Sequence, residues 1–584
     1  MTSERSPTST LAQRWAGPAL IALVALAMTS WTWRMWADPV VDFGGEAYVA
    51  WRLSAGDVLY RDLAYFTGPL SPYLNSLWMR VFGASLTTLA GANLALLALS
   101  LVVLYRLLGE IASRLAASVA CVMFTVLCAL AVHQGAGNYN FVWPYSHEMT
   151  HATLLALVSF ALAARWSRQP SPTNALWLGL VCGLVVLTKV EFTAALGAGL
   201  TMVLVLTPIA GPQKLKHGLL ALSATCVAPS VAFAALATAM PAREAWRGVL
   251  GAWIYVGDER VGDFPLYRAA LGLLGFGHHA LRIVLWGLGT LAFVAVARAL
   301  ARRLGTLPTL AVTTALCTAA FAFVPWVDAF YPLSFSTAAL LVFVVRRRAD
   351  HPLGALRAGF VAFALVLLLR IALNVRVQFY GFALAGPAVV VSCAALMEWI
   401  PATLERGRRA LQVALLPALA SVVLGHLLPM ARGLRWNTVE LGTGPDRMLV
   451  GPRGDFVAQA LALIEKRCPA QGSVLVLPEG ALINYLSRRR APTRFFNFMP
   501  PELEMFGESA MVAALDASPP DLIVLVHRDT TEYGLPYFGR DYGAALYGWV
   551  KAHYRPLKLW SIDPKERPFE PGTRHAIAVL ERAR

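Results

Sequence analysis

Long apolar stretches separated by short polar turns fill the first three quarters of the chain. Each stretch is close to the roughly 20 residues that an α-helix needs to cross the hydrocarbon core of a bilayer. The pattern therefore predicts a polytopic α-helical membrane protein with about 13 transmembrane helices. The predicted helices cover residues 16–36, 86–108, 115–133, 148–165, 174–189, 191–209, 218–240, 279–298, 307–325, 330–345, 355–374, 379–400 and 410–430.

The pattern changes after Pro429, and residues 440–584 contain no long apolar run. Short apolar segments alternate there with segments of helical periodicity, which is typical of a small α/β domain. We predict a transmembrane domain over 1–430 and an α/β domain over 440–584. The predicted strands are 473–478, 521–527 and 576–580, and the predicted helices are about 454–466, 502–516 and 541–552.

Composition excludes a single water-soluble globule. Of the 584 residues, 57% are hydrophobic and 14% are charged, and the mean hydropathy is +0.57. Soluble domains carry about 45–50% apolar and about 25% charged residues. The chain is too apolar and too poor in charge for that class.

The net charge of +16 comes from 50 Lys and Arg against 34 Asp and Glu. In a membrane protein, short basic cytoplasmic loops explain such an excess better than nucleic-acid binding. The basic clusters fall between alternate pairs of predicted spans, so all of them lie on one face. This pattern predicts a multi-pass protein of the inner (plasma) membrane, with the loop 37–85 and residues 440–584 outside the cytoplasm. The clusters are Arg5 and Arg14, Arg106 and Arg114, Arg165 and Arg168, Lys214 and Lys216, Arg298 to Arg303, Arg346 to Arg348, and Arg406 to Arg409.

The first outer loop contains two carboxylates close to the membrane exit. Asp42 lies where the chain turns at two glycines, and Glu46 begins an amphipathic helix that carries Tyr48 and Trp51. Aromatic side chains of this kind suit the membrane interface. A carboxylate at the edge of a bilayer can serve as a general base. Alternatively, Asp42 only caps the helix.

Four segments resemble those of a known enzyme superfamily. They are Asp42 to Glu46, Leu59 to Asp62, Gly68-Pro69-Leu70, and the Gly-x-x-x-Leu-Thr-Lys element that ends at Lys189. Together with the span pattern they resemble the GT-C superfamily of polyprenyl-phosphate-sugar-dependent glycosyltransferases, in particular the protein O-mannosyltransferase-like family 39. The commonest family pattern has adjacent Asp and Glu residues, whereas three residues separate Asp42 from Glu46 here. Either carboxylate could therefore be the base.

The resemblance implies sugar transfer on the extracytoplasmic face. The donor would be a polyprenyl-phosphate sugar in the bilayer, and the acceptor a hydroxyl of a glycan, a lipid or a protein. Asp42 would take the proton of that hydroxyl, and the anomeric configuration would invert. No nucleic acid is expected as a partner. No metal-ligand set stands out beyond Asp42 and Glu46, and the sequence leaves open whether a divalent metal ion assists.

Cations at outer helix ends are candidates for binding the donor phosphate. Lys189 should have a partner, because a bare charge near hydrocarbon costs roughly 2.5–3.5 kcal/mol. Glu191 or a donor phosphate could fill that role. Arg376, in a segment that ends at Tyr380, is the second candidate. Arg52 and Arg61 are weaker candidates, because interfacial arginines often only extend toward water.

A competing motif, His147-Glu148-x-x-His151, stands at the start of the fourth span. On a helix this spacing places both imidazoles on one face, as in zinc metalloproteases. A third ligand is not evident in the sequence, so we expect His147, Glu148 and His151 to line the outer cavity instead. A transporter or flippase of lipid-linked glycans is a further alternative, but transporters usually show repeats with helices broken near the midplane.

Overall fold

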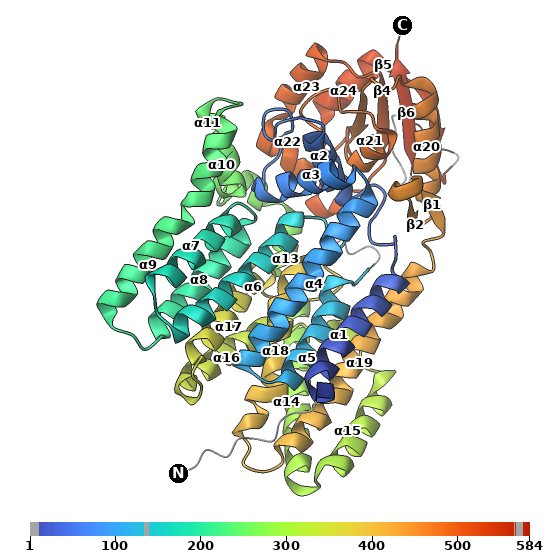
Figure 1. The fold of residues 1–584 in the computed structure, drawn as a ribbon. Helices are drawn as coiled ribbons and strands as arrows, with labels where there is room; N and C mark the ends of the chain where they lie inside the picture. Colours follow the sequence, from blue (N-terminus) through green and yellow to red (C-terminus); the bar gives the residue numbers. More distant parts are fainter. Residues whose placement is uncertain (1–10, 134–138, 564, 566, 568–575, 584) are drawn as a thin grey trace.

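The computed structural model describes residues 11–133, 139–563, 565, 567 and 576–583 (Figure 1). Arg5 and part of the loop 134–147 therefore lie outside the described residues. Apolar helices form a bundle, and an α/β unit that contains the C-terminus covers one end of it. The helices of the bundle are α1 (Leu11–Trp31), α4 (Leu86–Ile111), α5 (Arg114–Phe124), α6 (His147–Arg168), α7 (Pro172–Val186), α8 (Val190–Leu206), α9 (Gly211–Thr225), α10 (Val227–Ala237), α14 (Phe276–Arg303), α15 (Thr306–Phe321), α16 (Leu333–Arg346), α17 (Gly354–Leu368), α18 (Gly386–Ala394) and α19 (Arg408–Leu434).

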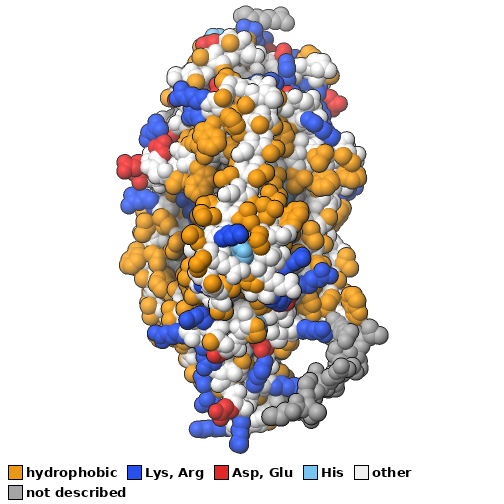
Figure 2. Space-filling model, turned by 60° about the vertical axis from the view of Figure 1, so that its left-hand side comes forward, with side chains coloured by type: hydrophobic (Ala, Val, Ile, Leu, Met, Phe, Trp, Pro, Cys, Tyr) orange, Lys and Arg blue, Asp and Glu red, His pale blue; other side chains and the backbone are white. Residues whose placement is uncertain are grey.

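Each of the predicted apolar stretches contains one of these helices, and the stretch 218–240 contains parts of two, α9 and α10. Within the described residues, seven helices are long and apolar enough to cross a membrane. Shorter apolar helices, among them α7 and α8, complete the bundle. Figure 2 shows hydrophobic side chains spread over the middle of one face, with Lys and Arg toward both its upper and its lower end. An apolar belt with charged ends is the surface that a bilayer requires.

The basic clusters gather at the end of the bundle opposite the α/β unit. Helix α6 has 22 residues and is about 33 Å long at 1.5 Å per residue. Its last residue, Arg168, forms an ion pair with Glu110 near the end of α4. The Arg357 Nε donates to the Ile111 carbonyl oxygen at the same end, 2.6 Å away. His147, the first residue of α6, lies at the other end, beneath the α/β unit.

The first outer loop forms two helices that pack on the bundle. They are α2 (Phe43–Ser54), which is the predicted amphipathic helix, and α3 (Leu70–Phe82). The loop between α10 and α14 forms α11 (Ala242–Leu250), α12 (Glu259–Gly262) and α13 (Pro265–Leu271). These short helices surround the outer end of the bundle and support the cavity described below.

The α/β unit is built on a four-stranded sheet of order β3-β4-β6-β5. Strands β3 (Val474–Leu477) and β4 (Leu522–Val526) are parallel, and all their residues are buried. Continuous apolar runs of this kind are typical of strands covered on both faces. Strand β6 (Ile577–Arg582) is antiparallel to β4 and to β5 (Tyr554–Trp560). The other elements are β1 (Val439–Leu441), β2 (Met448–Val450), α20 (Gly454–Arg467), α21 (Ala481–Ser487), α22 (Pro500–Phe506), α23 (Glu508–Ala517) and α24 (Ala544–His553).

Two predicted helices differ from the structure in detail, and one strand of the four-stranded sheet was not predicted. The helix predicted over 502–516 is two helices, because Gly507 between them has a φ of 84°. Strand β5 was not predicted, since Pro556 interrupts its pattern; proline is tolerated there because β5 lies at the sheet edge. The first helix ends at Trp31 rather than residue 36. The Trp36 indole folds back to donate to the Thr32 hydroxyl.

Candidate active site

A cavity of about 1400 Å³ lies between the outer end of the bundle and the α/β unit. Asp42 and Glu46 line it from the first outer loop, Glu148 and Lys189 from α6 and the start of α8, and Arg528 from the α/β unit. The cavity thus collects polar groups from parts of the chain that are hundreds of residues apart. Its wall also includes apolar side chains of α17 and of the segments that follow it, namely Val366, Leu369, Ile371 and Leu384.

Asp42 presents an open carboxylate to this cavity. It occupies the N-cap position of α2, but its side chain makes no capping hydrogen bond. Its φ of 61° and ψ of −84° lie outside the usual regions for a residue with a side chain. The backbone N–H of Asp42 donates to Glu479 Oε1 at 2.8 Å. The capping interpretation therefore fails, and the backbone is held so that the side chain faces the cavity.

The surroundings of Asp42 favour its protonated form. The side chain is exposed to the cavity, yet the protein around the cavity and the nearby Glu479 carboxylate raise its pKa to about 7. The Arg528 guanidinium acts in the opposite direction. A carboxyl group with a pKa near neutrality is well matched to proton transfer at physiological pH.

Glu46 is held in a hydrogen-bond network instead. Its Oε2 lies 2.8 Å from His147 Nδ1, and the Tyr65 hydroxyl lies 3.4 Å from its Oε1. Burial raises the pKa of Glu46 to about 7. Glu148 lies beside it and accepts hydrogen bonds from the hydroxyls of Tyr65, Thr67 and Ser146. Both glutamates therefore have partners within the protein.

The Gly68-Pro69 loop and the Leu-Thr-Lys segment meet in the structure. The Gly68 N–H donates to the Thr188 carbonyl oxygen at 3.1 Å. A β-carbon at Gly68 would lie 2.2 Å from the Leu187 carbonyl oxygen, so only glycine fits there. This contact brings Thr67, which binds Glu148, next to the start of α8. Two of the four segments on which the resemblance rests thus meet at one wall of the cavity.

Lys189 lines the cavity without a carboxylate partner. Its Nζ is 3.3 Å from the Tyr145 hydroxyl and 3.5 Å from Ser146 Oγ, and it lies 4.7 Å from the centre of the Tyr145 ring. Among the described residues no acidic group lies within ion-pair distance of it. Glu191, one of the two partners considered for Lys189, lies 4.0 Å from Arg370.

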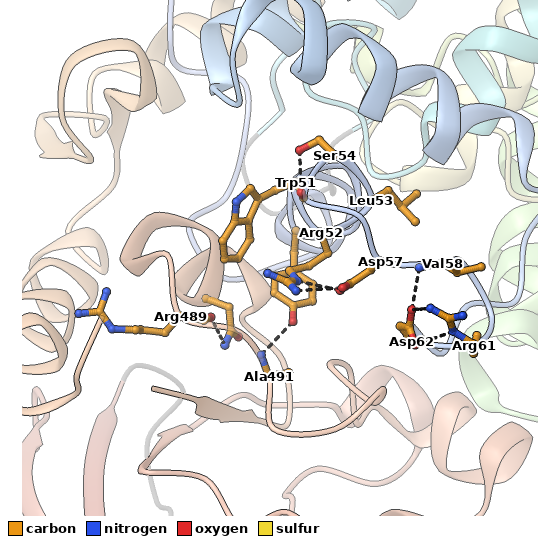
Figure 3. A network of polar contacts seen from close by, with 12 residues as sticks. Trp51, Arg52, Leu53, Ser54, Asp57, Val58, Arg61, Asp62, Arg489 and Ala491 are labelled. Atoms are coloured by element: carbon orange, nitrogen blue, oxygen red, sulfur yellow. Dashed lines mark hydrogen bonds and ion pairs between the residues drawn. The ribbon is translucent and has the colours of Figure 1, made fainter. Parts of the chain in front are cut away.

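The structure places three predicted arginines away from the cavity wall, and Figure 3 shows two of them, Arg52 and Arg61. Arg52 forms an ion pair with Asp57 at 2.8 Å, and Arg61 forms one with Asp62 at 2.7 Å. Arg376 lies near His279 and Tyr331, beside the outer part of α14. None of the three is among the described residues that line the cavity. The side chain of Tyr380, the remaining candidate, lies outside what the structure describes.

The His-Glu-x-x-His motif does not form a metal site in this arrangement. His147 uses both ring nitrogens, Nδ1 toward Glu46 and Nε2 toward the Asn93 side chain at 2.9 Å. His151 is buried behind it, with the ring centres 6.1 Å apart. No set of three or more His, Cys, Asp or Glu residues in the described part of the chain is grouped to hold a metal ion. The geometry argues against a zinc metalloprotease.

Sequence reasoning missed Glu479 and Arg528. Glu479 follows β3 and Arg528 follows β4, and these two strands are parallel neighbours. The carboxyl ends of parallel strands meet at one edge of a sheet, which is where α/β proteins bind ligands. The Arg528 Nε lies 2.7 Å from Glu479 Oε2. Polar residues directly after two predicted strands were the available signal.

No protein-family model matches the chain, and a search of curated proteins finds no match. Among solved structures, the oligosaccharyltransferase of Archaeoglobus fulgidus tethered with an acceptor peptide aligns with 14% identity and a TM-score of 0.51. The alignment covers 95% of this chain and 74% of that one. ArnT from Cupriavidus metallidurans in the apo state aligns over 98% of both chains, with 14% identity and a TM-score of 0.43. The similarity to the oligosaccharyltransferase shows a shared fold.

Proposed function

We propose that this protein is a membrane glycosyltransferase that moves a sugar from a polyprenyl-phosphate donor to an acceptor hydroxyl on the extracytoplasmic face. The observation that carries the proposal is the open Asp42 carboxylate, held in a strained backbone at a cavity that Lys189 also lines, with no carboxylate within ion-pair distance of Lys189 among the described residues. The shared fold supports the reaction class. The finer assignment to family 39 rests on the sequence motifs in 42–70 and 183–189.

The proposed step is a single displacement. Asp42 accepts the proton of the acceptor hydroxyl while the oxygen forms a bond to the anomeric carbon. The bond from the anomeric carbon to the phosphate oxygen breaks, and its electron pair leaves with the polyprenyl phosphate. Attack opposite the leaving group inverts the anomeric configuration. Of the two candidate carboxylates, Asp42 is assigned as the base, because His147 already contacts Glu46 Oε2 whereas the Asp42 carboxylate is exposed to the cavity.

The donor phosphate is assigned to the Lys189 side of the cavity. A cation at that position stabilises the negative charge that develops on the departing phosphate. The Tyr145 and Ser146 hydroxyls hold Lys189 but do not neutralise it. Apolar residues of the cavity wall, such as Val366 and Leu369, offer a surface for the first isoprene units. Arg376 has no part in this assignment, because it does not line the cavity.

The test is transfer of labelled sugar from a polyprenyl phosphate by membranes that contain the protein. We expect Asp42→Asn to lower the rate by about 10²–10⁴-fold, the usual contribution of a general base. Asp57→Asn is the matched control, because Asp57 belongs to the same loop but pairs with Arg52 away from the cavity. Full activity of Asp42→Asn would refute the assigned base. Movement of the intact donor across the membrane without transfer would favour a flippase.

A further inference from the structure

The α/β unit contacts the catalytic loop directly. Glu479 Oε1 accepts the backbone N–H of Asp42 at 2.8 Å, although the two residues are 437 positions apart. Glu479 Oε2 lies 2.7 Å from the Arg528 guanidinium, which also contacts Glu532 at 3.2 Å. A series of contacts, from Arg528 to Glu479 and from Glu479 to Asp42, thus connects the carboxyl ends of β3 and β4 with the proposed base.

A second set of contacts fixes the helix that follows Asp42. Gly44 packs against α21 so closely that a β-carbon there would lie 2.5 Å from the Leu482 nitrogen. The Tyr48 hydroxyl accepts the backbone N–H of Ala491 at 2.9 Å. Figure 3 shows this last contact below α2, at the segment that contains Ala491. Helix α2 is therefore attached to the α/β unit at its first turn and one turn later.

We propose that Glu479, held by Arg528, is a positioning residue for Asp42, and that the α/β unit completes the catalytic site. This inference rests on the proposed function, in which Asp42 is the base. The domain predicted over 440–584 then acts together with residues 1–430 in one active site rather than as an appended module.

Two physical effects make Glu479 suited to this role. Its carboxylate accepts the N–H of Asp42, whose backbone conformation is strained and persists only where neighbouring groups hold it. Its charge also acts on Asp42. The Glu479, Asp38 and Glu532 carboxylates raise the pKa of Asp42, and the Arg528 guanidinium lowers it. Glu502 also interacts with Asp42 by like-charge repulsion. A buried Glu479 needs the Arg528 partner to stay charged.

The first experiment measures the Asp42 N–H itself by hydrogen exchange and mass spectrometry of the full-length protein in detergent. We expect Glu479→Ala to abolish protection of the Asp42 amide. Glu508→Ala is the matched control, because Glu508 also accepts a backbone N–H in the α/β unit, that of Leu546 at 2.9 Å, away from the cavity. Retained protection in Glu479→Ala would overturn the inference. This measurement needs no enzyme activity, so it is independent of the proposed function.

The second experiment measures sugar transfer in the same variants. We expect Glu479→Ala to lower kcat by about 10- to 100-fold with little change in KM, since misplacement of a reacting group by 1 Å can cost 10²-fold. Glu479→Gln keeps an acceptor oxygen but loses the charge. It should lose less activity, and the acidic limb of its pH profile should move to lower pH. The inference would be overturned if Glu479→Ala and Glu508→Ala lowered kcat equally. It would also be overturned if the acidic limb of the pH profile stayed at the same pH in Glu479→Gln. Absence of sugar transfer by the unaltered protein would instead refute the proposed function.

Discussion

At the scale of single residues, the carboxylates of Asp42 and Glu46 are only four positions apart but differ in their hydrogen-bond partners. Glu46 is bound by His147, whereas the Asp42 carboxylate has no hydrogen bond to another side chain among the described residues and faces the cavity. A base must have a free lone pair directed at its substrate. The environment, rather than the residue type, therefore separates the proposed base from its neighbour.

The raised pKa of Asp42 predicts an acidic limb in the pH dependence of kcat/KM. With a pKa of about 7, the carboxylate is protonated below neutral pH and cannot accept the acceptor proton. We expect kcat/KM to fall about tenfold per pH unit below that point and to level off above it. Glu46 and Glu502 also have pKa values of about 7. Measuring the profiles of Glu46→Gln and Glu502→Gln separates the three groups, and loss of the limb in either variant would show that Asp42 is not its source.

At the scale of elements, two close contacts between backbone segments fix the position of the first outer loop on its neighbours. The loop at Gly68 rests on the end of α7, and the first turn of α2 rests on α21. Both contacts occur where glycine removes the β-carbon that would otherwise separate the backbones. The cavity wall thus depends on two glycines that carry no chemistry themselves.

Adjacent glycines at the start of α2 allow a matched test of this contact. A β-carbon at Gly44 would meet Leu482, whereas one at Gly45 would make only an ordinary contact of 3.6 Å with Phe496. We expect Gly44→Ala to destabilise the protein by about 1–3 kcal/mol, the usual cost of overpacking. Gly45→Ala should be neutral or stabilising by up to about 1 kcal/mol, because it lowers the entropy of the unfolded chain. Thermal unfolding in detergent measures both, and equal midpoints would contradict the predicted contact.

At the scale of the whole molecule, charge distinguishes the two ends of the helix bundle. The basic clusters lie at the end opposite the α/β unit, and the cavity lies beneath that unit. Basic loops remain in the cytoplasm during membrane insertion. The asymmetry therefore predicts that the cavity opens outside the cytoplasm, where a lipid-linked donor would present its sugar.

Cysteine labelling tests this orientation. Arg61, on the outer loop, and Arg348, after α16, are both exposed and belong to opposite ends of the molecule. In a background without the seven native cysteines, Arg61→Cys should react with a membrane-impermeant maleimide in intact cells. Arg348→Cys should react only after permeabilisation. The reverse pattern would place the cavity in the cytoplasm and would refute the proposed function.

The sequence by itself determined the class of protein, the places of its helices and the strands β3, β4 and β6, because these follow from the length and period of apolar runs. It also identified Asp42, Glu46, Glu148 and Lys189, which the structure brings into one cavity. Only the tertiary structure decided which carboxylate is open, that Arg52, Arg61 and Arg376 lie elsewhere, and that Glu479 contacts Asp42. Such facts depend on distances between segments up to 437 residues apart, and local periodicity contains no information on how distant segments pack.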